Sequence, residues 1–168
     1  MLKIKLLPYS PKYKSKFKKI KRDLLTIVDN KDEIEHIGST AINGISAKPI
    51  IDILIGINTN EIDSYIPKIK KLGFIYEKKY EKKIENRRFF YKNKNNHREI
   101  HIHLVNKNTY WYKRHIAFRN ALRQNALLKL QYQALKTKLS EKEWIDSNEY
   151  AEAKSPFIRS IEKKLNII

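Results

Sequence analysis

The sequence of 168 residues contains no cysteine and no long unbroken apolar run. The absence of cysteine excludes a disulfide framework and a thiolate metal cluster, so any metal ion would have to be held by Asp, Glu, His or carbonyl groups. Lysines interrupt residues 1–8, which excludes the apolar core of a signal peptide, and nothing reaches the length of a membrane span. We therefore expect a cytoplasmic protein without a membrane partner.

Acidic residues are also few, with 18 Asp and Glu against 36 Lys and Arg, for a formal net charge of +18. Such a charge attracts phosphate groups on nucleotides, nucleic acids or anionic membrane surfaces. Only eight of the basic residues are arginine, the side chain that nucleic-acid readers favour for bidentate contacts. The abundance of lysine, isoleucine and asparagine is equally what AT-rich coding produces, so the charge supports a nucleic-acid partner only weakly.

The first half of the chain predicts a helix followed by strands. Ser10 and Pro11 are typical of a helix start, and apolar residues then recur at steps of three and four from Tyr13 to Ile27. The lysines of this helix are expected to form a solvated face. Residues 34–37 and the apolar run 49–55 are predicted to be strands in the centre of one sheet.

The next segment predicts a second helix, capped by Asn60 and ended by Gly73, and then a change to strand periodicity. Strands are predicted over residues 74–80, 86–91 and 98–105, and the polar run 93–96 predicts a hairpin turn between the last two. These strands should extend the sheet in antiparallel fashion.

From Thr109 onward the periodicity is helical. Ser140 and Glu143 match a capping box, and a single last helix is predicted through residues 150–165. The whole chain is predicted to form one α/β (α+β) domain over residues 1–168. Its sheet-forming part, about 1–106, contributes a mixed or antiparallel sheet of about five strands with flanking helices, and its helical part covers about 107–168.

The strongest candidate site lies between the first two strands. Gly38 and Ser39 form a turn in which successive amides could bind phosphate oxygens. Asp52 stands in the apolar strand that follows, where a buried carboxylate needs a cation, a metal ion or hydrogen-bond donors. A phosphate-binding turn facing a strand carboxylate is the arrangement that metal-assisted phosphoryl or nucleotidyl transfer requires.

Three segments, EHIGSTA at 35–41, KPIIDI at 48–53 and HIHLV at 101–105, resemble the signature segments of the GrpB family. The resemblance continues through Arg88, Trp111, His115, Arg119, Tyr150 and Lys154, and covers nearly the whole chain. The family is a poorly characterised bacterial group, and the resemblance implies a fold like that of the polymerase-β-type nucleotidyltransferases. Enzymes of that superfamily place an Asp-x-Asp pair on the strand after the Gly-Ser turn.

This chain keeps the turn, the twelve-residue spacer and Asp52, but it has Leu54 where the second carboxylate should stand. The resemblance therefore makes Asp52 the candidate catalytic residue and leaves nucleotidyl transfer in doubt, because a two-metal site needs several carboxylates. Glu35, His101 and His103 could complete a site for Mg²⁺, Mn²⁺ or Zn²⁺ with Asp52. Gly38, Ser39, Thr40, Lys48 and Arg88 are the candidate ligands for phosphate.

The sequence thus supports three functional hypotheses. The leading one is a nucleotidyltransferase-like protein that binds a nucleotide or another phosphorylated ligand with a divalent metal. The alternative is a noncatalytic accessory module on a scaffold that has lost its catalytic carboxylates. A third is RNA binding through the basic first helix and the hairpin region 79–98.

Overall fold

The computed structural model describes residues 1–59, 61–81, 84 and 86–167. The predicted helices and strands occur in the expected order, two short strands that were not predicted, Leu2–Lys3 and Glu143–Trp144, are added, and short 3₁₀ turns, labelled η, lie between some of the elements. In chain order the elements are β1 (Leu2–Lys3), α1 (Lys12–Leu24), β2 (Glu33–Ile37), η1 (Ser39–Ala41), β3 (Ile51–Ile57), η2 (Ile62–Ser64), α2 (Tyr65–Lys71), β4 (Ile75–Tyr76), η3 (Lys78–Tyr80), β5 (Arg87–Lys94), β6 (His97–Asn106), α3 (Tyr110–Gln124), α4 (Ala126–Ser140), β7 (Glu143–Trp144), α5 (Ser147–Glu152) and α6 (Ser155–Lys164).

The main sheet has five strands in the order β2-β3-β6-β5-β4. β3 and β6 pair in parallel, whereas the other neighbours are antiparallel. The α+β class and the mixed sheet predicted from the sequence are confirmed. One detail is wrong: β2 was expected in the centre of the sheet but lies at its edge, whereas β3 has a neighbour on each side and side chains buried on both faces, as expected.

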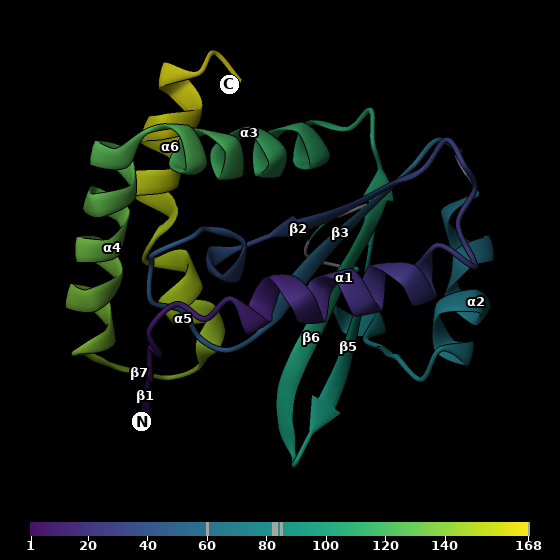
Figure 1. Cartoon of the computed structure of the whole chain (residues 1–168), viewed down its shortest axis with the longest axis horizontal. Helices are drawn as coiled ribbons and strands as arrows, with labels where there is room; N and C mark the ends of the chain where they lie inside the picture. Colours follow the sequence, from purple (N-terminus) through teal and green to yellow (C-terminus); the bar gives the residue numbers. More distant parts are fainter. Residues whose placement is uncertain (60, 82–83, 85, 168) are drawn as a thin grey trace.

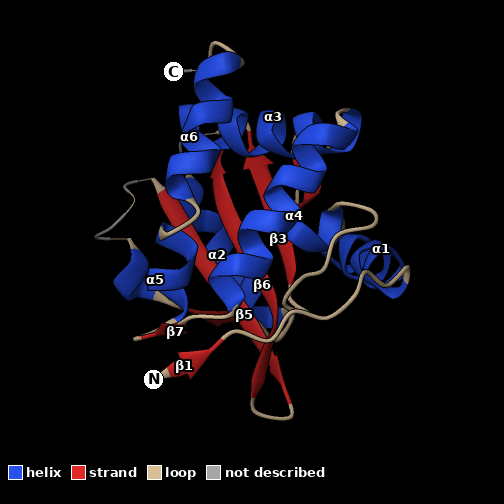
Figure 2. Ribbon diagram, turned by 90° about the vertical axis from the view of Figure 1, so that its left-hand side faces the viewer, coloured by secondary structure: helices blue, strands red, loops and turns tan. Residues whose placement is uncertain are grey.

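One face of the sheet packs against α1 and α2. The odd-numbered isoleucines of β3, from Ile51 to Ile57, are fully buried there because successive strand residues point to opposite faces. Tyr13, Ile20 and Leu24 of α1 cover them in the same cluster as Tyr65 and Ile69 of α2. Figure 1 shows α1 crossing in front of the strands, and Figure 2 shows the same helix end-on, beside the sheet.

The opposite face carries the even-numbered residues of β3 and meets the helical C-terminal part. Ile37, Leu54 and Val105 pack on Tyr112 of α3. Beyond this contact, α4, α5 and α6 gather at one end of the sheet, seen in green and yellow in Figure 1. The small sheet of β1 and β7 ties the N-terminus to this helical part through a separate apolar cluster around Trp144.

Three local predictions are wrong. The strand expected over 74–80 is reduced to β4, because a 3₁₀ turn begins at Lys78. Ser140 does not begin a helix but ends α4, and Glu143 lies in β7; Asp146 instead caps α5 by accepting from the amides of Asn148 and Glu149.

The expected last helix is two helices, since α6 starts afresh with a proline in its first turn. The predicted cap Asn60 lies outside the described residues. In the part of the chain that the structure describes, every helix is too short or too polar to cross a bilayer.

The β5–β6 hairpin turns at Asn95 and Asn96, as the polar run predicted. Both residues have positive φ, 49° and 60°, and Lys94 pairs with His97 across the turn. This is the backbone of a two-residue type I′ turn, whose twist matches that of the strands and whose second position favours glycine. Asparagine is the non-glycine residue that tolerates this left-handed conformation best.

We therefore predict opposite effects for two substitutions at one position of this turn. Asn96→Gly should raise the free energy of unfolding by about 0.5 kcal/mol because glycine adopts positive φ without a steric penalty. Asn96→Ala should lower it by about 1 kcal/mol because alanine does not. Urea unfolding monitored by circular dichroism measures both changes, and a shift of the same sign in the two variants would refute the turn assignment.

Candidate functional site

The pairing of three strands brings Asp52 and His101 together. Asp52 of β3 lies opposite Ile37 of β2 on one side and His101 of β6 on the other. Directly opposite residues project to the same face of a sheet, so the two polar side chains become neighbours. The carboxylate Oδ1 of Asp52 is 3.1 Å from Nδ1 of His101.

Gly38 lets the turn after β2 approach this carboxylate closely. Its φ of 71° and ψ of −176° fall in a region of backbone space that is essentially restricted to glycine. A Cβ at this position would collide with the carboxylate group of Asp52. The backbone of the turn therefore lies directly against Asp52, as the spacing of Gly38, Ser39 and Asp52 led us to expect.

Thr40 holds the turn in place from the inside. Its hydroxyl is buried and donates to the carbonyl of Ile50 at 2.9 Å, so it must accept the hydrogen bond from Nε2 of His36 at 3.0 Å. This arrangement fixes the His36 tautomer with its proton on Nε2. Thr40, predicted as a phosphate ligand, thus uses its hydroxyl to join the turn to the start of β3.

Two lysines face Asp52 from other parts of the chain. Lys48 comes from the loop before β3 and donates from Nζ to the Ser147 hydroxyl at 3.3 Å. Burial lowers the pKa of Lys154 to about 8, while Asp52 raises it and Lys48 lowers it. Burial also lowers the pKa of Lys48, again against the influence of Asp52. We call Gly38, Ser39, Lys48, Asp52, His101 and Lys154 the Asp52 cluster.

The helical C-terminal part surrounds this cluster with polar groups. Ser39 hydrogen-bonds to the Tyr132 hydroxyl, and burial raises the pKa of Tyr132. Lys136 is 1% exposed, donates to the carbonyl of Ser46, and has its pKa lowered to about 7 by burial and by the charge of Lys154. The Nζ of Lys154 lies 4.4 Å from the centre of the Tyr150 ring.

Three buried side-chain atoms of the described residues have no hydrogen-bond partner, and two of them belong to this region. They are Nε2 of His101, a member of the cluster, and the hydroxyl of Tyr150, whose ring contacts Lys154; the third is Nε of Arg87. A buried polar atom without a partner costs about 1–3 kcal/mol of stability. Such atoms are frequent where a protein binds a ligand or ordered water.

The other proposed metal ligands lie one step along the same face but are engaged elsewhere. Glu35, Leu54 and His103 form the next row across the sheet, so Leu54 separates the carboxylate from the imidazole. Glu35 forms an ion pair with Arg119. In the described part of the chain, no three His, Asp or Glu side chains come together in a way that could hold a metal ion.

His103 lies in an aromatic stack rather than beside Asp52. Its Nδ1 is 3.3 Å from a guanidinium nitrogen of Arg87, and its ring contacts Phe89 and Trp111. Burial, followed by the charge of Arg87, lowers the pKa of His103 well below its usual value. The ring is therefore neutral at physiological pH.

Arg88 lies on the opposite face of the sheet from Asp52. It pairs with Leu104 in the register and binds Asp63 at 2.6 Å and Glu81 at 3.5 Å. Its neighbour Arg87 is the arginine that shares the Asp52 face. The sequence could not distinguish the two, because strand alternation assigns faces only when the pairing register is known.

The sequence analysis did not single out Lys136, and it named Lys154 only as part of the family resemblance. A signal for Lys136 exists, since it follows Tyr132 by four residues and therefore lies within the apolar stripe of α4. A lysine in such a stripe is unusual, because burial disfavours its charge.

The contact between Gly38 and Asp52 leads to a prediction with a matched control. Gly38→Ala should destabilise the protein by about 3 kcal/mol, through both backbone strain and collision with the carboxylate. Gly44→Ala should cost only about 1 kcal/mol, because Gly44 also has positive φ but a Cβ there would meet nothing within 4 Å. Denaturant unfolding measures both effects. When each substitution is made in the Asp52→Ala protein, the destabilisation by Gly38→Ala should become smaller, whereas that by Gly44→Ala should not change.

His36 predicts how stability depends on pH. Burial lowers its pKa to about 4, against an ordinary value of 6.5. The charge of Asp52 raises this pKa, whereas the charges of Arg123 and Arg119 lower it further. Between these two values only the unfolded chain is protonated at this position, so the folded state should lose stability as the pH falls from 6.5 to 4, by about 3 kcal/mol in total. Above pH 6.5 this histidine contributes no pH dependence.

Melting temperatures at pH 4.5 and 7.5 test this expectation. His36→Gln should reduce the difference between the two, because glutamine can still donate to Thr40 but does not titrate. His97→Gln, at an exposed position in the hairpin, should leave the difference as it is in the wild type. The same difference in melting temperature in all three proteins would mean that His36 is not the titrating group.

Comparison with known proteins gives a consistent assignment over the whole chain. The chain is 34% identical to the glutamate-rich protein GrpB of Alkalihalophilus pseudofirmus, over 93% of this chain and 92% of that protein. It is 33% identical to a UPF0157 protein of Halalkalibacterium halodurans, over 97% of this chain and 83% of that protein. The crystal structure of conserved protein GrpB from Enterococcus faecalis superposes with a TM-score of 0.82 at 31% identity, covering 95% of this chain and 96% of that one. The family model described as GrpB protein matches residues 3–164, and the chain therefore belongs to the GrpB family.

Proposed function

We propose that this GrpB protein binds a phosphorylated ligand, with nucleotides as the first class to test, at the Asp52 cluster. The observation that carries the proposal is the excess of positive charge around a single carboxylate. Lys48 and Lys154 face Asp52 together: the charge of Asp52 raises the pKa of both lysines, and the charge of Lys48 lowers the pKa of Lys154. A phosphate group between the two lysines would offset the repulsion between them and favour their charged forms.

The Gly38–Ser39 turn and the partnerless polar atoms support the same location. The turn brings its backbone and the Ser39 hydroxyl to the cluster without a side chain at position 38 in the way. Nε2 of His101 and the Tyr150 hydroxyl are buried atoms that a ligand oxygen or a bridging water could satisfy. The Tyr150 hydroxyl can donate to a phosphate oxygen, which is a strong acceptor. Nδ1 of His101 carries the proton that Asp52 accepts, so Nε2 is an acceptor that a ligand hydroxyl or a bridging water could satisfy.

A divalent metal ion would find two protein ligands here, Asp52 and His101. Leu54 fills the position of a further carboxylate, and Glu35 and His103 are engaged by Arg119 and Arg87. Mg²⁺ is commonly held by one or two protein groups together with substrate phosphates and water, so a ligand-completed site fits these residues better than a preformed one. The metal would supply additional neutralisation of the phosphate charge.

Binding without group transfer is the role that the cluster supports best. Leu54 is fully buried against Ile37, Val105 and Tyr112, and a carboxylate there would have to be desolvated in this apolar contact. Asp52 remains as the single carboxylate of the cluster. The two-metal arrangement of nucleotidyl transfer needs more negative charge than that.

Calorimetric titration tests the proposal. Nucleoside mono-, di- and triphosphates are titrated into the wild type with Mg²⁺, Mn²⁺ or Zn²⁺, and again with EDTA. Lys154→Met should weaken binding about tenfold or more, since a charge-assisted hydrogen bond to phosphate is lost. Lys138→Met, at an exposed position on α4, is the matched control and should bind as the wild type does.

The pH dependence provides a second readout for Lys154. Its pKa of about 8 in the free protein means that affinity should fall as the pH rises through 8, because only the charged lysine donates a charge-assisted hydrogen bond to the phosphate. Lys154→Met should abolish this fall. Lack of binding by the wild type, or identical binding by Lys154→Met, would refute the proposal, and release of pyrophosphate from a bound triphosphate would show transfer instead of binding alone.

A further inference from the structure

A second basic region lies outside the Asp52 cluster, at the free edge of β2. It is a cavity of about 450 Å³ between α1, β2, the η1 turn, α3 and the start of α4, which we call the β2 groove. Six cationic side chains line it: Lys14, Lys18, Lys21, Arg119, Arg123 and Lys129. Glu35 is the one carboxylate among the lining residues.

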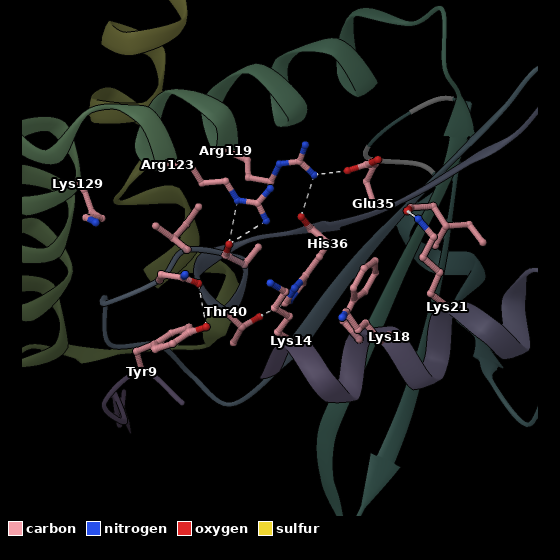
Figure 3. A pocket seen from close by; sticks show the side chains of 15 residues that line it. Tyr9, Lys14, Lys18, Lys21, Glu35, His36, Thr40, Arg119, Arg123 and Lys129 are labelled. Atoms are coloured by element: carbon pink, nitrogen blue, oxygen red, sulfur yellow. Dashed lines mark hydrogen bonds and ion pairs between the residues drawn. The ribbon is translucent and has the colours of Figure 1, made fainter. Parts of the chain in front are cut away.

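The cations come from opposite walls of the groove. Lys14, Lys18 and Lys21 follow the i, i+4, i+7 spacing that places them on one face of α1, and Arg119 and Arg123 are one turn apart on α3. Figure 3 shows the lysines of α1 on one side, the two arginines on the other and Lys129 at one end. The face of α1 that was expected to be simply solvated is thus partly directed into a cavity.

The arginines are held in fixed positions. Arg123 donates from Nε and one terminal nitrogen to the carbonyl of Ala41, at 3.1 and 3.0 Å. Arg119 donates to the carbonyl of His36 at 3.0 Å and forms the ion pair with Glu35. Their guanidinium groups therefore need little reorganisation to meet an anion.

The positive charge is left without compensation. Glu35 is already used by Arg119, and Lys14, Lys18 and Lys129 have no ion pair or side-chain hydrogen bond with any residue that the structure describes. Burial and the nearby charge of Arg119 lower the pKa of Arg123, as expected for like charges brought together. A cavity lined by one sign of charge concentrates counter-ions.

We propose that the β2 groove is a second anion-binding site, which takes a small oligophosphate with several adjacent charged groups. An oligophosphate carries several adjacent charged groups, which can contact the lysines of α1 and the arginines of α3 together. The volume of about 450 Å³ is in the range of small-molecule sites. Lys14 and Lys18 act as flexible point charges, whereas Lys21, which donates to the carbonyl of Ile34, and the two arginines are held in place.

This site is separate from the Asp52 cluster and does not depend on its function. The cluster lies on the face of the sheet covered by the helical C-terminal part, whereas the groove lies beyond the edge strand. Thr40 and Ala41 of the η1 turn line the groove, while Gly38 of the same turn contacts Asp52. Each site can therefore be disabled without substitution in the other.

Titration with inorganic tripolyphosphate in 100 mM KCl tests the groove, using the Lys154→Met protein, in which binding at the Asp52 cluster should be at least about tenfold weaker. Saturable binding of one molecule per chain is expected, with affinity that falls as the salt concentration rises. Lys18→Gln/Arg123→Gln should weaken it at least about tenfold. Glu35→Gln should strengthen it several-fold by removing the competing carboxylate.

Lys70→Gln/Lys71→Gln on α2 removes the same number of charges at exposed positions away from the groove, and it should leave binding unchanged. An equal loss in both double variants would show diffuse charge attraction and overturn the proposal. Absence of saturable binding would overturn it as well. Binding of a ten-nucleotide single-stranded RNA but not of tripolyphosphate would mark the groove as a nucleic-acid path and contradict the proposed ligand.

Discussion

The contact between the Gly38 backbone and the Asp52 carboxylate is the constraint on which the rest of this region depends. It exists because β2 ends opposite Asp52 in the register and because residue 38 has no side chain. Once the carboxylate is enclosed between the turn and His101, its charge must be balanced from the remaining direction. That direction is the helical C-terminal part, which supplies Lys154, and the loop before β3, which supplies Lys48.

Leu54 determines how the polar residues of this face are distributed. It lies in register between Glu35 and His103 and is buried under α3. The two polar residues are separated by it, and each is paired with an arginine instead, Glu35 with Arg119 and His103 with Arg87. The face is therefore divided into an Asp52 region rich in lysine and two arginine pairs. Membership of the GrpB family accounts for the fold on which this division is built. What this face binds has to be argued from its residues.

Most of the fold could be predicted from periodicity, and the errors share a cause. The apolar stripe of α1, the apolar run of β3 and the asparagine turn of the hairpin are patterns within single segments, and each predicted its element correctly. The edge position of β2 and the shortening of the strand after Gly73 depend on which strands pair, which the sequence does not contain. Ser140 and Glu143 have the spacing of a capping box, but tertiary packing draws Glu143 into a strand with the N-terminus.

The same distinction applies to the site. Gly38, Ser39 and Asp52 became candidates because their spacing along the chain is short, and His101 because it lies in the segment HIHLV that resembles the family. Arg87 could not be assigned to this face without the pairing register, and the charge role of Lys154 depends on long-range packing that brings it to Asp52. Arg88 shows the limit of the sequence prediction: it is next to Arg87 on β5, but neighbouring strand residues point to opposite faces of the sheet, so only Arg87 lies on the Asp52 face.

The cations at the β2 edge have a structural consequence as well. An edge strand exposes backbone groups that can pair with a strand from another molecule, which is a common route to aggregation. Here Lys21 donates to the carbonyl of Ile34 at 2.8 Å and Arg119 to that of His36 at 3.0 Å, so two of the outward acceptors of β2 are already occupied. Strand addition at this edge would have to displace both charged side chains and bring a new backbone among several like charges. The basic character of this protein thus helps to keep its sheet from growing beyond one chain.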